Sequence, residues 1–349
     1  ARTWGTNSIF IDSNGLNYQG DPDTFTVEYT TSGQSINIVY SDATKGWVPL
    51  EDDVTALEPV APPTQRAIFA YGFASDYTAV KNLVNSSGVV ASDVTGVGTA
   101  RSGLAAASYD GDKAVFAFGN TGSVTNLKNL VNNSGVVAAD VTGVGTARER
   151  LAAASYGTGL AIFAHGTTGS ATAISNLVNT SGVIASDVSG VGTARFGLAA
   201  SSFGGDKAIF GYGRPGSGNS SLTNLVSNVG VLSSDVTGVG TARRDIAAAS
   251  YGGDKGVFGY GIASSSSNVT NKVSNVGVVA TDTTGVGSAR YYLAATGYGG
   301  DKAIFGFGST GSVTGITNLV NNSGLVAADV SAVGTAREKP AAAGYSTSA

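Results

Sequence analysis

The string Thr95-Gly96-Val97-Gly98-Thr99-Ala100-Arg101 returns, with small changes, six times along the chain. The arginines that end the copies are 47, 47, 48, 47 and 47 residues apart: Arg101, Arg148, Arg195, Arg243, Arg290 and Arg337. A fixed period of this length indicates an array of small supersecondary units. The sequence therefore predicts a repeat protein from about residue 66 to the C-terminus.

One repeat, residues 104–148, contains short apolar runs separated by Gly, Asn and Asp. They are the Ala-rich run 104–109, the Phe-containing run 113–119, and two further runs at 126–131 and 136–141. Such runs are typical of strands. A helix is the alternative for the Ala-rich run, but that run is too short to sustain a helical nucleus. We predict four antiparallel strands in each repeat.

Four short strands in about 45 residues form the blade of a β-propeller. The Phe-containing run occurs six times, and so does the Ala-rich run, whose last copy is Ala341–Tyr345. The array thus begins with the second strand of a blade and ends with the first. We predict an all-β chain with a six-bladed propeller of about 47 residues per blade, closed by the C-terminal strand. A linear β-solenoid is the alternative, although it gives no reason to split a repeat between the two ends.

The repeat resembles the kelch family. The stretch Arg195–Gly213 has an arginine before an apolar strand that ends in Phe203-Gly204, where kelch repeats have a Gly-Gly pair. The later Tyr and Trp of the kelch pattern are absent. The resemblance implies a kelch-like propeller in which the arginine can line the mouth of a central channel and contact acidic ligands.

Composition changes near Pro62-Pro63, because both tryptophans and five of the seven prolines lie in the first 63 residues. That part carries nine acidic residues against only two basic ones. We predict a small β module at 1–50, an acidic, Pro-rich connector at 51–65, and the propeller at 66–349.

Within the module, residues 24–29 alternate polar and apolar side chains, as a half-buried strand does. Residues 36–40 are interpreted as the hairpin partner of that strand. About 50 residues give a marginal core. We therefore expect the module to dock on the propeller, on its own copies or on a larger assembly, and we expect the chain to be oligomeric in that assembly.

Composition excludes several classes of site. The chain has no cysteine, so disulfides and thiolate metal sites are impossible. It contains no 18-residue apolar run and no signal-peptide pattern, so we expect no membrane insertion. A pI of about 5.0 with dispersed Lys and Arg argues against nucleic acid. We expect no cofactor and no metal.

Catalytic groups are scarce. His165, the only histidine, occupies a position held by Tyr or Phe in the other repeats, so we interpret it as structural. One histidine supports neither a Ser–His–Asp triad nor the copper site of galactose oxidase. The Asp-boxes of sialidases, the other propeller enzymes considered, are absent. Asp residues in the Gly-Asp-Lys turns and at strand ends are interpreted as satisfying backbone donors. We predict that the protein is not an enzyme.

The repeated arginines are the first candidate ligand-binding group. Six equivalent positions must lie on one circle, and guanidinium groups suit carboxylate, phosphate or sulfate. The alternative is structural: each arginine pairs with its own repeat's Asp or caps carbonyls between blades.

The two residues after each arginine differ among repeats and form the second candidate group. Arg244, Tyr291 and Tyr292 are the ligand-binding candidates among these pairs. A constant frame with divergent loops is how scaffolds present binding sites. Drift at unconstrained positions is the alternative.

The string Tyr40-Ser-Asp-Ala-Thr-Lys-Gly-Trp47 resembles short β modules in structural proteins of tailed bacteriophages, especially marine and cyanobacterial ones. This resemblance implies a virion protein, in the head or the tail, that binds other virion proteins through residues 1–50. We expect the propeller to project from the particle and to bind protein or host-surface glycan through its loops. The alternative is a secreted or cell-surface propeller lectin or adhesin.

Overall fold

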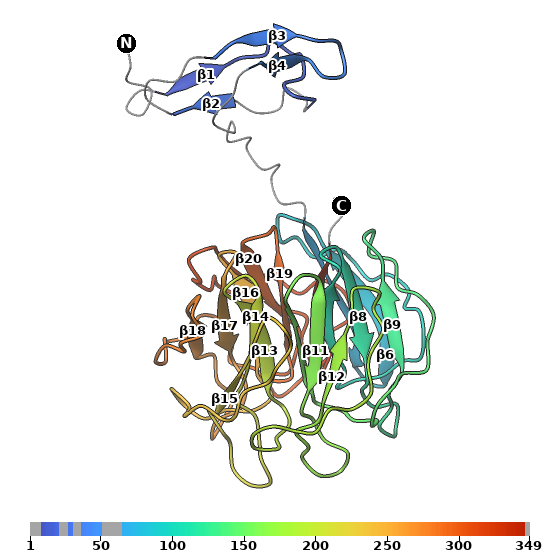
Figure 1. The fold of residues 1–349 in the computed structure, drawn as a ribbon. Coiled ribbons are helices and arrows are strands. Elements are labelled where there is room, and N and C mark those ends of the chain that lie inside the picture. The colour runs from blue at the N-terminus through green and yellow to red at the C-terminus, as the bar shows by residue number, and fades with distance from the viewer. Residues whose placement is uncertain (1–7, 21–26, 31–35, 51–64, 346–349) are drawn as a thin grey trace. The chain divides into compact units, whose positions relative to one another are not determined.

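The computed structural model describes residues 8–20, 27–30, 36–50 and 65–345. These residues form strands, turns and isolated bridges, with no helix among them. The chain divides into two compact units, Ala1–Pro62 and Pro63–Ala349 (Figure 1). The predicted connector at 51–65 lies, apart from Gln65, outside the described residues.

The described residues of the first unit form two strand pairs. β1 (Ile9–Ile11) pairs with β2 (Val27–Tyr29), and β3 (Ile38–Tyr40) pairs with β4 (Trp47–Pro49), both antiparallel. The described strands β2 and β3 therefore do not form the predicted hairpin, whose turn at 31–34 lies outside the described residues. Its place is taken by a shorter-range hairpin between β3 and β4, because the intervening sequence closes a tight turn.

That turn is built by Asp42. One carboxylate oxygen accepts hydrogen bonds from the backbone N–H groups of Thr44 and Lys45, at 2.8 and 2.7 Å. The next residue, Gly46, has a left-handed backbone with φ 67°, and a Cβ there would lie 1.6 Å from the carbonyl oxygen of Asn17. The Asp-x-x-x-Gly-Trp spacing thus specifies local structure.

The described residues of this unit form a small core. Tyr18, Val27 and Tyr29 are buried, and the two tyrosine hydroxyls lie 2.8 Å apart. Ile11 and Trp47 are among the half-buried side chains around them. These few buried side chains among the described residues provide a modest hydrophobic stabilisation.

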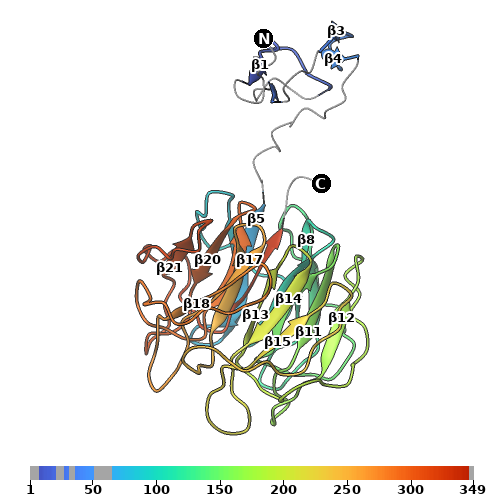
Figure 2. The same cartoon turned by 60° about the vertical axis from the view of Figure 1, so that its left-hand side comes forward.

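The second unit consists of repeated three-stranded antiparallel sheets, an architecture consistent with a β-propeller (Figures 1 and 2). In each sheet the Ala-rich strand is at one edge and the Phe-containing strand is in the middle. The sheets, in this order of strands, are β22-β5-β6 (Ala341–Tyr345, Arg66–Phe73, Tyr77–Val84), β7-β8-β9 (Ala105–Tyr109, Lys113–Ala117, Lys128–Val131), β10-β11-β12 (Ala152–Tyr156, Leu160–Ala164, Ser175–Val178), β13-β14-β15 (Ala199–Phe203, Lys207–Gly211, Thr223–Val226), β16-β17-β18 (Ala247–Tyr251, Lys255–Gly259, Thr270–Val273) and β19-β20-β21 (Ala294–Tyr298, Lys302–Gly306, Thr317–Val320).

The middle strands are buried on both faces. Val115 and Phe116 are adjacent in β8, so their side chains point to opposite faces, and both have no exposed surface. One face of β8 packs in the same core cluster as Ile68 and Tyr71 of the preceding sheet. Each sheet is thus covered on both sides by its neighbours, which is why these strands are apolar on both faces.

The C-terminal strand completes the sheet that begins the repeats. β22 pairs antiparallel with β5, and Ala343 lies opposite Ile68. This is the pairing that the split repeat predicts. The Ala-rich strands are also neighbours in the order β7, β10, β13, β16, β19 and β22, and β22 lies against β7.

The fourth predicted strand is not a regular strand. Residues 136–141 meet β9 at two isolated bridges, which involve Val137 and Val141. Between the bridges, the side-chain amide of Asn129 donates to the carbonyl oxygen of Ala138 and to Asp140, at 2.9 Å each. Side-chain bonds therefore replace part of the outer ladder, and three strands per sheet remain regular.

Candidate functional site

The repeated arginines hold neighbouring sheets together. Within its own sheet, Arg101 donates from Nε to the carbonyl oxygen of Phe118 at 3.0 Å and from its two terminal nitrogens to Thr99 O at 3.1 Å and Asn129 Oδ1 at 2.6 Å. Its guanidinium also lies 4.3 Å from the ring centroid of Tyr71 in the preceding sheet. A planar guanidinium can make directional bonds in its plane while it stacks on an aromatic face.

Arg148, Arg195 and Arg337 repeat these three hydrogen bonds, whereas Arg243 and Arg290 make two of them each. All six arginines have no exposed surface: Arg101, Arg148, Arg195, Arg243, Arg290 and Arg337. Burial lowers the pKa of Arg148, Arg195 and Arg337 to about 10, so these groups stay charged at neutral pH. A ligand at the surface does not reach them. The structure thus corrects the interpretation of the arginines as ligand-contacting groups and gives them the structural role that the sequence also allowed.

His165 lies among the repeated arginines, where neighbouring sheets contact each other. It is fully buried, its backbone is left-handed at φ 63°, and its carbonyl oxygen accepts the Nε–H of Arg148 at 2.8 Å. Burial, together with the charge of Arg195, lowers the pKa of His165 to about 3. Its imidazole is therefore neutral at ordinary pH and lies away from the surface, where it contacts Phe210.

The variable pairs after the arginines converge in one place. The second residue of each pair donates its backbone N–H to the carbonyl oxygen of the second residue in the preceding repeat, and the first repeat bonds to the last. We call these six residues the mouth ring. Its hydrogen bonds, of 2.6–3.1 Å, are Gly103 to Lys339, Arg150 to Gly103, Gly197 to Arg150, Asp245 to Gly197, Tyr292 to Asp245 and Lys339 to Tyr292.

All six mouth-ring residues have left-handed backbones, with φ between 52° and 64°. Glycine adopts this conformation freely, whereas each other residue pays roughly 1 kcal/mol or more for it. Glycine occupies only two of the six positions, and the other four carry charged or aromatic side chains. Such strained positions tend to mark functional sites, so we treat the mouth ring as the candidate site.

Two of these side chains meet across a glycine. Arg150 donates from a terminal nitrogen to Asp245 Oδ1 at 2.5 Å, and its guanidinium lies 4.4 Å from the ring centroid of Phe196. Between them is Gly197, where a Cβ would lie 2.5 Å from Asp245 Oδ1. Asp245 is buried, and Arg244 Nε approaches its other oxygen at 3.4 Å. Burial raises the pKa of Asp245, and the two guanidinium groups oppose that rise.

An aromatic pair completes the site. Lys339 Nζ lies 4.5 Å from the ring centroid of Tyr292, which contacts Tyr291 edge-to-face with centroids 5.0 Å apart. Burial, aided by the charge of Asp245, raises the pKa of Tyr292 to about 12, so this phenol keeps its proton and can donate a hydrogen bond.

Beneath the mouth ring lies an apolar floor. The residue that follows each mouth-ring position is apolar and buried, and together these residues line a cavity of about 70 Å³, which we call the mouth cavity. They are Leu104, Leu151, Leu198, Ile246, Leu293 and Pro340. The mouth cavity therefore combines a polar rim with an apolar base.

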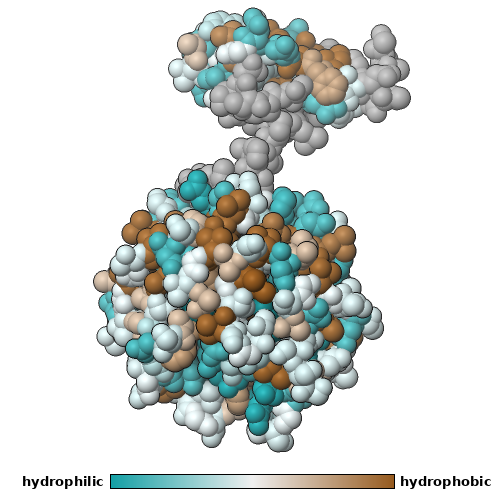
Figure 3. Space-filling view, turned by 180° about the vertical axis from the view of Figure 1, so that it is seen from behind, coloured by the Kyte–Doolittle hydropathy of each residue, from teal (hydrophilic) through white to brown (hydrophobic). Residues whose placement is uncertain are grey.

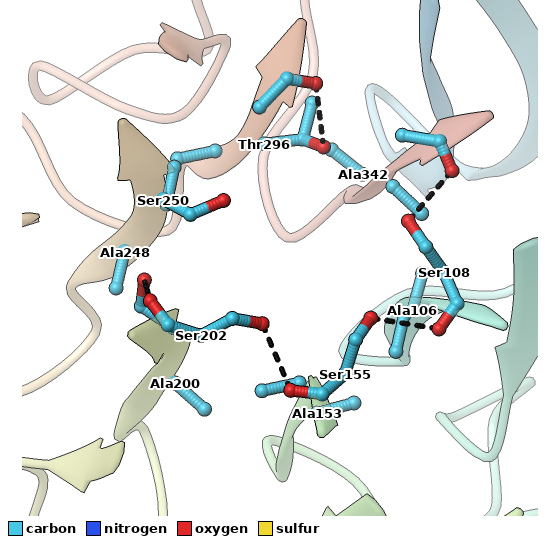
Figure 4. A pocket seen from close by; sticks show the side chains of 18 of the residues that line it. Ala106, Ser108, Ala153, Ser155, Ala200, Ser202, Ala248, Ser250, Thr296 and Ala342 are labelled. Atoms are coloured by element: carbon cyan, nitrogen blue, oxygen red, sulfur yellow. Dashed lines mark hydrogen bonds between the residues drawn. The ribbon is translucent and has the colours of Figure 1, made fainter. Parts of the chain in front are cut away.

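Further along the same Ala-rich strands is a second cavity, of about 90 Å³, lined by Ala, Ser, Gly, Thr and Gln65 (Figure 4). Ser155 Oγ donates to Ser108 O at 2.7 Å, and Ser202 Oγ to Ser155 O at 2.8 Å. Its lining residues carry no ionisable side chain, so this cavity offers only hydroxyl, amide and carbonyl groups.

The Asp residues at strand ends link neighbouring sheets. Asp140 accepts hydrogen bonds from the backbone N–H and the hydroxyl of Thr99, at 2.8 and 2.6 Å, and also from Asn129. The Asp of a Gly-Asp-Lys turn pairs with its Lys, as Asp206 does with Lys207 at 2.6 Å. Within the described part of the chain, no three His, Cys, Asp or Glu side chains gather where a metal ion could bind.

The outer turns of the repeats expose hydrophobic side chains. Val229 and Val276 are 70% and 72% exposed, at positions where the other four turns carry Ser. Figure 3 shows hydrophobic patches, in brown, on one face of the molecule. Exposed apolar patches of this kind are common at protein–protein contacts. The described residues include no helix long and apolar enough to cross a bilayer.

Of the residues that the sequence singled out, Tyr292 belongs to the mouth ring and lines the mouth cavity. Arg244 and Tyr291 contact the mouth-ring residues Asp245 and Tyr292. Sequence reasoning did not single out Arg150 and Asp245, although it noted that their pairs vary. Arg150 and Asp245 are each the second residue of their pair. That shared position was the signal, because the second residues form the hydrogen-bonded ring. No protein-family model matches the chain, and no curated protein matches it significantly.

Proposed function

We propose that the repeats form a closed six-bladed β-propeller that acts as a binding module without catalysis. Two observations support closure: the pairing of β22 with β5, and the mouth-ring hydrogen bonds that return from Gly103 to Lys339. With this closure, β22 covers the edge of β5 that would otherwise be unpaired.

The mouth ring carries the binding proposal. Four of its six positions hold large polar or aromatic side chains on strained backbones, where glycine would be free of strain. Their charges are largely paired with one another, as in Arg150 with Asp245 and Lys339 with Glu338 at 3.6 Å. Paired groups of this kind suit recognition better than proton transfer, which needs a group that titrates near the working pH.

We further propose that the protein belongs to a bacteriophage particle. The likeness of the Tyr40–Trp47 string to phage structural modules supports this assignment. The small core that the described residues of the first unit form supports attachment of residues 1–50 to other virion proteins. Exposed valines on the outer turns, such as Val229 and Val276, support further protein contacts in an oligomeric assembly.

Mass spectrometry of purified phage particles from the source culture tests this assignment. We expect the chain in tens to hundreds of copies per particle, and the copy number distinguishes head decoration from a tail fibre. Its presence only in culture medium or on cells would contradict the virion proposal and favour a secreted or cell-surface lectin.

A further inference from the structure

The mouth cavity contains two buried polar atoms without hydrogen-bond partners. One is Asp245 Oδ2, on a side chain that is 1% exposed; the other is Arg150 Nε. Arg244 Nε, 3.4 Å from Asp245 Oδ2, compensates the charge of that oxygen without a hydrogen bond. Buried polar groups are nearly always hydrogen-bonded, so this pair calls for an external partner.

The two atoms need opposite partners. Asp245 Oδ2 accepts a hydrogen bond, whereas Arg150 Nε donates one. A hydroxyl group can accept from the guanidinium and donate to the carboxylate at the same time. Lys339 adds an ammonium group with three N–H donors, held beside the Tyr292 ring. The rim thus suits a ligand with neighbouring hydroxyls.

The base of the cavity restricts the ligand further. Its floor is apolar, with Leu198 and Ile246 next to the Arg150–Asp245 pair. Carbohydrates present hydroxyls along their edges and apolar C–H groups on their faces, which matches a polar rim above an apolar floor. A volume of about 70 Å³ corresponds to roughly two or three water-sized groups. Only the hydroxyl edge of one sugar ring can therefore enter.

We propose that the mouth cavity binds the terminal pyranose of a glycan, with adjacent hydroxyls seated between Arg150, Asp245 and Lys339. This inference rests on the proposed binding function and names its ligand. Binding at one shallow site is weak, and a particle that carries many copies gains strength through multivalency.

Saturation-transfer NMR with a panel of methyl pyranosides tests the proposal on the full chain. We expect at least one pyranoside to bind at millimolar concentration and Asp245→Asn to weaken it roughly tenfold or more, because a charged hydrogen-bond partner is lost. Lys339→Met removes the ammonium at a half-buried position and keeps the proposal testable if Asp245→Asn unfolds. Lys207→Gln, in a Gly-Asp-Lys turn away from the mouth, is the matched control and should bind as the parent does.

Two results would overturn the proposal: no pyranoside binds the folded chain, or binding is the same in Asp245→Asn and Lys339→Met as in the parent. Capture of a host protein through the mouth, without sugar binding, would also reject the glycan ligand while leaving the proposed binding function in place. Absence of the chain from phage particles would affect the virion assignment alone.

Discussion

Arg150 and Asp245 come from repeats that are not adjacent, and a terminal nitrogen of Arg150 donates to Asp245 Oδ1 at 2.5 Å. The two side chains meet beside Gly197. The glycine of the intervening repeat leaves the space through which the arginine passes. One ion pair therefore ties three repeats together at the mouth. Its geometry depends on the absence of a single Cβ atom.

Gly197→Ala should destabilise the chain by more than the conformational cost of placing alanine in a left-handed backbone. The left-handed conformation costs about 1–2 kcal/mol for alanine. The new Cβ would also lie 2.5 Å from Asp245 Oδ1 and displace the ion pair. Gly111→Ala is the matched control, since Gly111 has φ 76° and a Cβ there would meet nothing within 4 Å. Urea unfolding should rank Gly197→Ala as the less stable variant; equal losses would contradict the clash.

His165 should make the fold sensitive to acid. In the unfolded chain its pKa is near 6.5, whereas in the folded chain burial lowers it to about 3. The unfolded state therefore takes up the proton first, and stability falls as the pH drops from about 6.5 towards 3. The full shift corresponds to a few kcal/mol, at about 1.4 kcal/mol per pH unit.

His165→Phe should remove this component, because Phe118 and Phe307 occupy the equivalent position in other repeats. Denaturant unfolding of both proteins between pH 7 and about 4 provides the measurement. Several carboxylates with lowered pKa values also make the fold less stable in acid, but both proteins contain them. Parallel stability curves for the two proteins would show that the histidine is not buried as described.

Arg101→Lys should destabilise the fold strongly, by about 3 kcal/mol or more, because lysine cannot reproduce the three directional hydrogen bonds of a buried guanidinium. Thermal unfolding measures the loss. Lys302→Gln, at an exposed turn, should change stability by less than about 0.5 kcal/mol. Unchanged stability in Arg101→Lys with lost ligand binding would restore the binding role first considered for the arginines.

The C-terminal strand should be essential to the repeats. A chain that ends at Lys339 lacks β22 and leaves β5 with an unpaired edge, so we expect aggregation and rapid proteolysis. A chain that ends at Tyr345 keeps the strand and serves as the control. Size-exclusion chromatography and limited proteolysis distinguish the two. Equal resistance of both chains would argue against closure through β22.

The sequence predicted the repeated strands well because their signals are local: apolar runs between glycines, repeated at a fixed period. It predicted the position of the arginines but not their burial, which depends on acceptors elsewhere in the sheet. An asparagine such as Asn129, 28 residues after Arg101, accepts the guanidinium in this way. The recurrence of that asparagine along the chain was the signal for a structural role.

Two other features could not be predicted from the repeated sequence pattern. Pairing of β1 with β2 joins Ile9–Ile11 to Val27–Tyr29, a contact between segments that carry no shared pattern. The fourth strand reads as apolar, yet Asn129 bonds to its backbone and interrupts the ladder. In both cases a tertiary contact outweighs the local preference for strand pairing.

In the proposed binding role, the mouth ring separates the backbone frame of the repeats from the side chains that recognise a ligand. Its hydrogen bonds use only backbone atoms, and the same bonds form at positions held by glycine, charged residues and tyrosine. Glycine adopts the left-handed backbone of each position without strain. Every other residue adds a side chain that can act as a recognition group, at a small conformational cost. Under the binding function proposed above, recognition groups can thus be exchanged one position at a time, by substitutions outside the strands.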